Sequence, residues 1–244
     1  MTIAAPSPSA ARGAALSSAR RLSLAAGALF LLTFVSAIAG AQLYGTALTD
    51  PRFALGAGTA TGALLGAVCE LVLIAANIGT ALALFPVLRR RFPALSLGYV
   101  AARIVECGFI ALGIVAVLTL VSLHRSAGSE PSVAAVAGAL VALHDWAFLL
   151  GPGFVVGVGN GLLLGVMMYR SRLVPRAMAL CGVIGGPLMT VSGIAVMFGA
   201  YPQFSPVSAV LTLPEIVWEG SLGVWLLLKG FAPAGLASSA PDES

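Results

Sequence analysis

The chain alternates long apolar stretches with short polar or basic connections. Six of the apolar stretches have at least about 20 residues, the length of an α-helix that crosses about 30 Å of hydrocarbon. The pattern therefore predicts an all-α integral membrane bundle of six transmembrane helices. The predicted spans cover about residues 22–43, 62–88, 95–123, 146–169, 177–198 and 207–228.

Two segments flank the predicted transmembrane domain of residues 20–231. Residues 1–19 are rich in Ala, Ser and Pro, and we expect a disordered cytoplasmic segment. Residues 232–244 are small, polar and acidic, and we expect a flexible tail.

The first apolar run also matches the outline of a signal peptide. Arg20 and Arg21 precede it, and Ala37-Ile38-Ala39 resembles a cleavage site. The run is longer than the usual apolar core of such a peptide, about 7–15 residues. We therefore interpret it as a retained first helix.

The segment before the fourth span is apolar but short. Residues 133–143 cannot cross about 30 Å of hydrocarbon, so we predict an interfacial or re-entrant helix there. The fourth span itself carries glycine at every fourth position, which forms one smooth stripe on a helix and favours close packing. These residues are Gly153, Gly157, Gly161 and Gly165.

The composition supports a membrane protein and excludes an ordinary soluble domain. The 244 residues are 59% hydrophobic and 9% charged, with mean hydropathy +1.02, whereas soluble domains carry about 25% charged residues. The cysteines, Cys69, Cys107 and Cys181, lie far apart inside apolar runs. Their spacing supports neither a disulfide framework nor a metal site.

The basic residues predict the orientation in the membrane. They flank the apolar runs, so the net charge of +4 is not a signal for nucleic-acid binding. With both termini in the cytoplasm, ten basic residues face the cytoplasm and two face outside. The cytoplasmic group is Arg12, Arg20, Arg21, Arg89, Arg90, Arg91, Arg170, Arg172, Arg176 and Lys229, and the external group is Arg52 and Arg125.

Several polar side chains lie inside or at the mouth of the predicted spans. A charge at bilayer depth costs at least about 2.5–3.5 kcal/mol, so each must face protein, water or a partner. The main candidates for a polar core or a ligand site are Glu70, Arg103, Glu106, Asn160 and Glu219. The secondary candidates are Asn77, Tyr99, His144, Asp145 and Glu215.

The spacing of these residues predicts where they meet. Glu70 lies about 12 Å into the second span, and Arg103 about 12 Å into the antiparallel third span, so both can lie near one level. Tyr99, Arg103 and Glu106 are spaced i, i+4, i+7 and share a helix face. One arginine cannot neutralise several carboxylates, so the surplus could hold a cation or a substrate. The alternative is an ion-pair network that only fixes helix packing.

Some secondary candidates have simpler interpretations. Residues 212–215, Thr-Leu-Pro-Glu, match a capping box in which Thr212 caps the last helix and Glu215 reaches back to it. His144 and Asp145 point about 100° apart on a helix, so they do not form a catalytic dyad by themselves. We interpret them as the polar start of the fourth helix. We predict no catalytic residue, no cofactor and no metal site.

Several stretches carry a resemblance to a known family. They are residues 143–176, LHDWAFLLGPGFVVGVGNGLLLGVMMYRSRLVPR, residues 185–199, GGPLMTVSGIAVMFG, residues 214–231, PEIVWEGSLGVWLLLKGF, and residues 101–106, AARIVE. Together they resemble the bacterial DUF4386 family over most of the chain, from about residue 21 to 231. The resemblance implies a polytopic membrane protein of unknown function, with no established substrate or catalytic residue. Cys107 departs from the family pattern, in which Ala or another small residue is common.

Three hypotheses about function remain open. The first is a bacterial plasma-membrane protein whose charged core, Glu70, Arg103, Glu106 and Glu219, binds or transports a small molecule, ion or proton. The second is a structural or assembly protein whose polar network only locks the bundle. The third is a membrane enzyme that acts on a lipid or quinone. The expected partners are the lipid bilayer and a small-molecule or ion ligand, without nucleic acid, and the sequence leaves the oligomeric state open.

Overall fold

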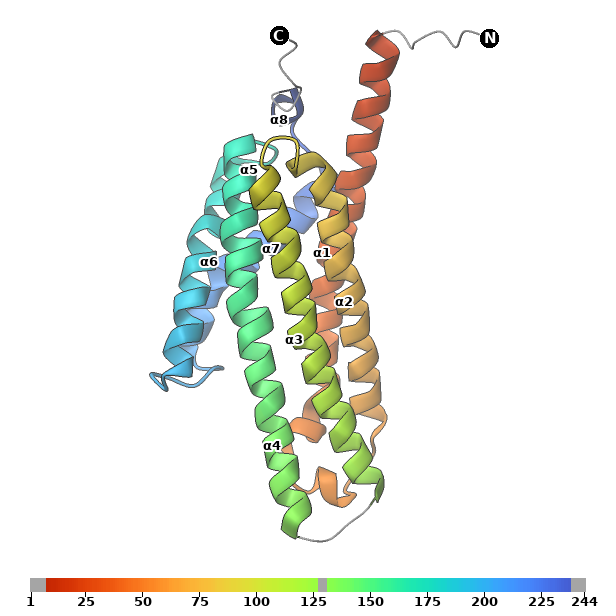
Figure 1. Ribbon diagram of the computed structural model, residues 1–244, viewed down its shortest axis with the longest axis vertical. Coiled ribbons are helices and arrows are strands. Elements are labelled where there is room, and N and C mark those ends of the chain that lie inside the picture. The colour runs from red at the N-terminus through yellow and green to blue at the C-terminus, as the bar shows by residue number, and fades with distance from the viewer. Residues whose placement is uncertain (1–7, 127–130, 238–244) are drawn as a thin grey trace, which may run out of the picture.

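The computed structural model describes residues 8–126 and 131–237, which form a bundle of long helices (Figure 1). Every regular element in these ranges is helical. The bounds are α1 Pro8–Thr49, η1 Phe53–Leu55, α2 Thr61–Leu88, α3 Pro93–Ser126, α4 Pro131–Phe148, η2 Leu149–Val155, η3 Gly157–Leu164, α5 Gly165–Ser171, α6 Arg176–Met197, α7 Pro206–Leu228 and α8 Pro233–Ala237.

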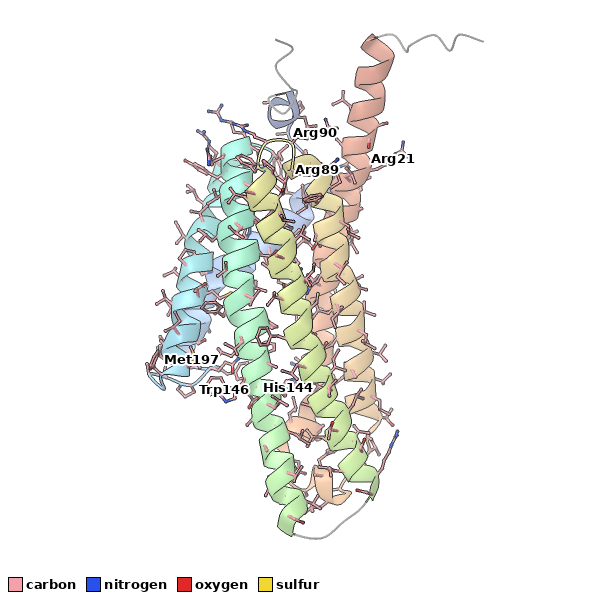
Figure 2. All side chains as sticks on the ribbon, in the orientation of Figure 1. Arg21, Arg89, Arg90, His144, Trp146 and Met197 are labelled. Carbon is pink, nitrogen blue, oxygen red and sulfur yellow. The ribbon has the colours of Figure 1, made fainter. Side chains whose placement is uncertain are left out.

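Within the described ranges, six helical segments are long and apolar enough to cross a membrane. They are Leu16–Thr49, Thr61–Leu88, Pro93–Ser126, Ser132–Ser171, Arg176–Met197 and Pro206–Leu228. The prediction of an all-α bundle of six transmembrane helices is thus confirmed, and the chain is a multi-pass membrane protein. Arg21, Arg89 and Arg90 lie at the same end of the bundle, away from His144 and Met197 (Figure 2).

The interpretation of residues 133–143 as a separate helix is wrong. Helix α4 continues through η2 and η3 into α5, so Ser132–Ser171 is one unbroken rod of 40 residues. Its Ala, Val and Leu residues contain no break before Pro152, and a rod of about 60 Å is longer than the hydrocarbon layer. His144 and Asp145 therefore lie inside α4 rather than at a helix start.

Two of the predicted ends also differ from the structure. Residues 8–19 belong to α1 and are not disordered, because this alanine-rich segment favours a helix that continues the first span. The prediction for residues 1–7 lies outside the described residues. In the tail, Pro233–Ala237 forms α8, and the Ala232 N–H donates to the Leu173 carbonyl at 2.8 Å. The part of the tail beyond residue 237 is outside the described residues as well.

Helix α7 starts earlier than the capping box predicted. Its first residue is Pro206, and the Ser205 side chain caps it by accepting a hydrogen bond from the Ser208 N–H at 3.2 Å. Proline fits the first turn of a helix, where its missing N–H has no partner to lose. Thr212 is therefore not a cap, and Glu215 lies buried within the helix rather than in its first turn.

The fourth membrane segment has a widened backbone where its glycines cluster. Both η2 and η3 are π-helical. The π-helix is rare in proteins overall, but where it occurs it is frequently at a functional site. A methyl group added at Gly157 or Gly161 would come within 2.7 or 2.4 Å of Gly186 on α6. One at Gly165 would lie 2.9 Å from an α6 backbone nitrogen, whereas Gly153 has no neighbour nearer than 3.7 Å. Three of the four stripe glycines thus let α6 approach closely.

Two hydrophobic clusters form the core, one near each end of the bundle. The basic-end cluster lies close to the arginines and includes Phe30, Leu84, Leu88, Met167, Met168, Trp218, Leu222 and Leu226. The far-end cluster includes Tyr44, Phe53, Ile110, Ile114, Val117, Leu120 and Val121. The polar side chains of the predicted core lie between these two clusters.

Candidate functional site

A cavity of about 480 Å³ lies between the two hydrophobic clusters. All six membrane segments contribute to its wall. Its charged and polar lining residues are Thr33, Tyr44, Thr49, Glu70, Asn77, Arg103, Glu106, His144, Asp145, Glu215 and Glu219. The rest of the wall is largely apolar: Phe34, Ala37, Ala41, Leu48, Leu73, Ile110, Phe148, Pro152, Val156, Met189, Phe204 and Ile216.

One side of the cavity holds a tightly bonded group on α2 and α3. Arg103 Nη1 donates to Glu106 Oε2 at 2.8 Å, and Arg103 Nη2 donates to Asn77 Oδ1. Asn77 Nδ2 in turn donates to Glu106 Oε1 at 2.9 Å. All three residues are buried, and their bonds satisfy both Glu106 oxygens. In this triad the Arg103 guanidinium compensates the Glu106 charge, and each terminal nitrogen of Arg103 makes a hydrogen bond within the triad.

A second group joins η3 to α7. Asn160 Nδ2 donates to Glu219 Oε1, and Trp218 Nε1 donates to the Asn160 carbonyl at 2.9 Å. Asn160 and Trp218 are both buried, so the asparagine faces the bundle and not the lipid. The Asn160 amide is neutral, so this hydrogen bond does not itself compensate a charge on the Glu219 carboxylate.

Glu215 has the most unusual surroundings in the cavity. It is only 1% exposed, and neither of its carboxylate oxygens has a hydrogen-bond partner among the described residues. Glycines make room for it: a methyl group at Gly161 would lie 2.6 Å from Glu215 Oε2, and one at Gly185 2.6 Å from the Glu215 nitrogen. The close crossing of η3, α6 and α7 thus brings an unpaired carboxylate into the cavity wall.

Glu70 and His144 line another part of the cavity. The Tyr44 hydroxyl on α1 donates to Glu70 Oε2 on α2 at 2.6 Å. The Tyr44 ring also packs edge-on against His144, with ring centroids 5.6 Å apart. His144 Nδ1 lies 3.6 Å from Asp145 Oδ1, which is beyond a good hydrogen bond, and the Asp145 side chain is 55% exposed. Neither arrangement is a catalytic dyad.

Comparison with protein families identifies what the chain is related to. A family model described as "Domain of unknown function (DUF4386)" matches residues 25–230. The chain belongs to the DUF4386 family. No curated protein and no solved structure matches it. The family description states no substrate or reaction, and the cavity is the feature of this DUF4386 chain that bears on its function.

The structure brings most of the sequence candidates together. Nine of the ten predicted polar residues line the cavity or bond to a residue that does: Glu70, Asn77, Arg103, Glu106, His144, Asp145, Asn160, Glu215 and Glu219. Tyr99 is buried in the basic-end cluster and does not line the cavity. Within the part of the DUF4386 chain that the structure describes, no three His, Cys, Asp or Glu residues are grouped to hold a metal ion.

Sequence reasoning missed some of the lining residues of this DUF4386 chain. The first predicted span ends at about residue 43, before Tyr44, but α1 continues through a kink at Gly45 to Thr49. The spacing of four between Gly40 and Tyr44 continues the helical pattern and was the available signal. Phe148, Phe204 and their apolar neighbours carried no signal, because apolar residues are ordinary in a membrane protein.

Proposed function

We propose that this chain binds a small, positively charged molecule or ion in the cavity of its transmembrane bundle. The observation that supports this most is the buried Glu215, which lines the cavity without a hydrogen-bond partner among the described residues. A buried carboxylate without a donor is costly, so it takes up a proton or holds a cation. Arg103 makes its side-chain hydrogen bonds to Glu106 and Asn77, and no hydrogen bond joins it to Glu215 among the described residues.

The charges around the cavity also favour a cation. After Arg103 and Glu106 compensate each other, the described lining still contains the carboxyl groups of Glu70, Asp145, Glu215 and Glu219. These groups repel anions and attract cations, and the attraction is strengthened where apolar walls lower the local dielectric constant. The lining also contains the aromatic side chains of Phe34, Tyr44, Phe148 and Phe204, a residue type that can bind cations.

The triad of Arg103, Glu106 and Asn77 supports a structural role for its part of the cavity. It is fully buried and pairs α2 with α3, as expected of a network that fixes helix packing. The alternative in which the polar core only locks the bundle is therefore favoured for this triad, and ligand binding is assigned to the carboxylates outside it.

For the cellular location, we propose the bacterial plasma membrane with both termini in the cytoplasm. The excess of arginine at one end of the bundle supports this orientation (Figure 2). Arg52→Cys and Lys229→Cys, each in a chain with alanine at its three natural cysteines, test it in whole cells. A membrane-impermeant maleimide should label position 52 and not position 229, and the reverse labelling would disprove the orientation.

Binding can be tested with a permanently charged probe. The purified protein in phosphatidylcholine nanodiscs is dialysed against radiolabelled butyltrimethylammonium, with empty nanodiscs as the blank. Saturable binding is expected for the natural chain and a loss of at least tenfold in affinity for Glu215→Gln. Butanesulfonate, which has the same tail and the opposite charge, should not bind.

The same preparation is examined by native mass spectrometry for a retained ligand. A bound cation or amine would support the proposal and identify the compound. Unchanged affinity in Glu215→Gln, or equal binding of butanesulfonate, would show that this carboxylate does not hold a cation.

A further inference from the structure

Helices α1 and α7 pack closely near the basic end. A methyl group at Gly27 would lie 2.7 Å from the Gly223 carbonyl, and one at Gly223 would lie 3.1 Å from Phe30. Arg20 also donates to the carbonyls of Leu226 and Leu227 at 3.3 and 3.1 Å. Farther along, α7 crosses the bundle obliquely and leads to α6 on the opposite side (Figure 1). The two helices therefore diverge beside the cavity.

Helix α4 does not close the gap that this divergence leaves. Among the described residues it packs on α3, η1 and η2, without an extensive contact to α1 or α7. The apolar cavity lining includes Phe34 of α1, Phe148 of α4 and Ile216 of α7, together with Phe204 just before α7. Phe148, Ile216 and Phe204 are 38%, 48% and 81% exposed, so the cavity reaches the lateral surface of the bundle here.

The chemistry of the wall changes along the cavity. Glu215 and Ile216 are neighbours on α7, and both line the cavity, yet the first is 1% exposed and the second 48%. Glu219 lies one helical turn from Glu215. At the lateral opening, Phe148 and Phe204 stand with ring centroids 6.1 Å apart. The cavity thus joins buried carboxylates to an apolar opening at the level of the membrane segments.

We infer that the ligand is an amphiphilic cation, with one positively charged head and an apolar tail, and that it enters sideways from the bilayer between α1, α4 and α7. This inference rests on the proposed cation binding at Glu215 and adds the class and the route of the ligand. The head lies at Glu215 and Glu219, and the tail lies along Phe148, Phe204 and Ile216. A lipid-soluble amine or a quaternary ammonium compound with an alkyl chain has this form.

A chain-length series tests the inference. Tetramethylammonium, butyltrimethylammonium and octyltrimethylammonium carry the same head, and their binding is measured by dialysis against the protein in phosphatidylcholine nanodiscs with empty nanodiscs as the blank. Each methylene group that is buried should raise the affinity roughly fourfold. We therefore expect octyltrimethylammonium to bind at least tenfold more tightly than butyltrimethylammonium.

A pair of matched variants locates the tail. Phe204 and Phe198 are 81% and 84% exposed near the same end of α6 and α7, but only Phe204 lines the cavity. Phe204→Ala should lower the affinity for octyltrimethylammonium at least threefold and leave the affinity for tetramethylammonium unchanged. Phe198→Ala should change neither affinity. Both positions are exposed, so the variants should fold, as the melting temperature will show.

The possible results separate the inference from the proposed function. Tight binding of octyltrimethylammonium that is weakened by Phe204→Ala supports both the cation site and the lateral route. Equal affinity for the three ions, with loss in Glu215→Gln, overturns the lateral route and keeps the cation site, which the ligand would then reach from water past Thr49 and Asp145. Binding of none of the ions to the natural chain overturns the cation site and the inference together.

Discussion

Two carboxylates in one cavity, Glu106 and Glu215, have opposite surroundings. Both are buried and both line the same space between the two hydrophobic clusters. Glu106 accepts hydrogen bonds from Arg103 and Asn77 on both oxygens, whereas Glu215 accepts none from the described residues. The first charge is compensated by the fold, and the second requires a proton or a ligand. The comparison shows that burial of a charge does not by itself distinguish a packing element from a binding site.

The largest expected effect comes from breaking the compensated pair. Glu106→Ala leaves the buried Arg103 guanidinium without its carboxylate, which typically costs about 3–5 kcal/mol. The free energy of unfolding, measured by denaturant titration in mixed micelles, should fall by this amount. A loss below about 1 kcal/mol would mean that the triad does not hold α2 to α3.

A smaller loss of stability is expected where the close packing around Glu215 is disturbed. Gly161→Ala places a methyl group 2.4 Å from Gly186 and 2.6 Å from the Glu215 carboxylate, so helices must shift. Overpacking of this kind costs about 1–3 kcal/mol. The control is Gly153→Ala in the same stripe, where the nearest atom is 3.7 Å away and no loss of stability is expected. The melting temperature of Gly161→Ala should be lower than that of Gly153→Ala. Equal melting temperatures would contradict the close crossing of η3, α6 and α7.

Glu215→Gln should leave the stability unchanged or raise it, in contrast to Glu106→Ala. The amide has nearly the same shape and removes an unpaired buried charge, so the free energy of unfolding should stay within about 1 kcal/mol or increase. The same denaturant titration measures it. A loss comparable to that of Glu106→Ala would show that Glu215 belongs to the packing network.

The smallest effect is expected at the exposed ion pair of the loop after α1. Arg52 Nη2 and Asp50 Oδ2 lie 3.2 Å apart, and the hydrogen bond from the Arg52 side chain lowers the pKa of the Asp50 carboxyl. Because the folded pKa is below the unfolded one, any stabilisation is present at neutral pH and is lost as the pH falls through the acid range. Solvent screening weakens such pairs, so Asp50→Asn should not measurably change the melting temperature at neutral pH. A clear shift would mark this loop as part of the folded core.

The sequence alone determined the membrane character and the set of polar candidates. Six apolar runs must span lipid as helices, and a charge such as Glu70 or Arg103 within them must turn inward, because lipid offers it no partner. The inward position of Asn160 and the close packing at Gly157, Gly161 and Gly165 follow from the same local patterns.

Only the tertiary structure decided which charges are paired and which are free. Local spacing assigned Glu215 to a helix cap, yet the crossing of η3, α6 and α7 places it beside glycines and away from every described donor. Arg103 could have paired with Glu70, Glu106 or Glu219, and the packing of α2 on α3 brings Asn77 to complete the triad with Glu106. Pairing depends on distances between helices, and helical periodicity specifies faces but not which faces meet.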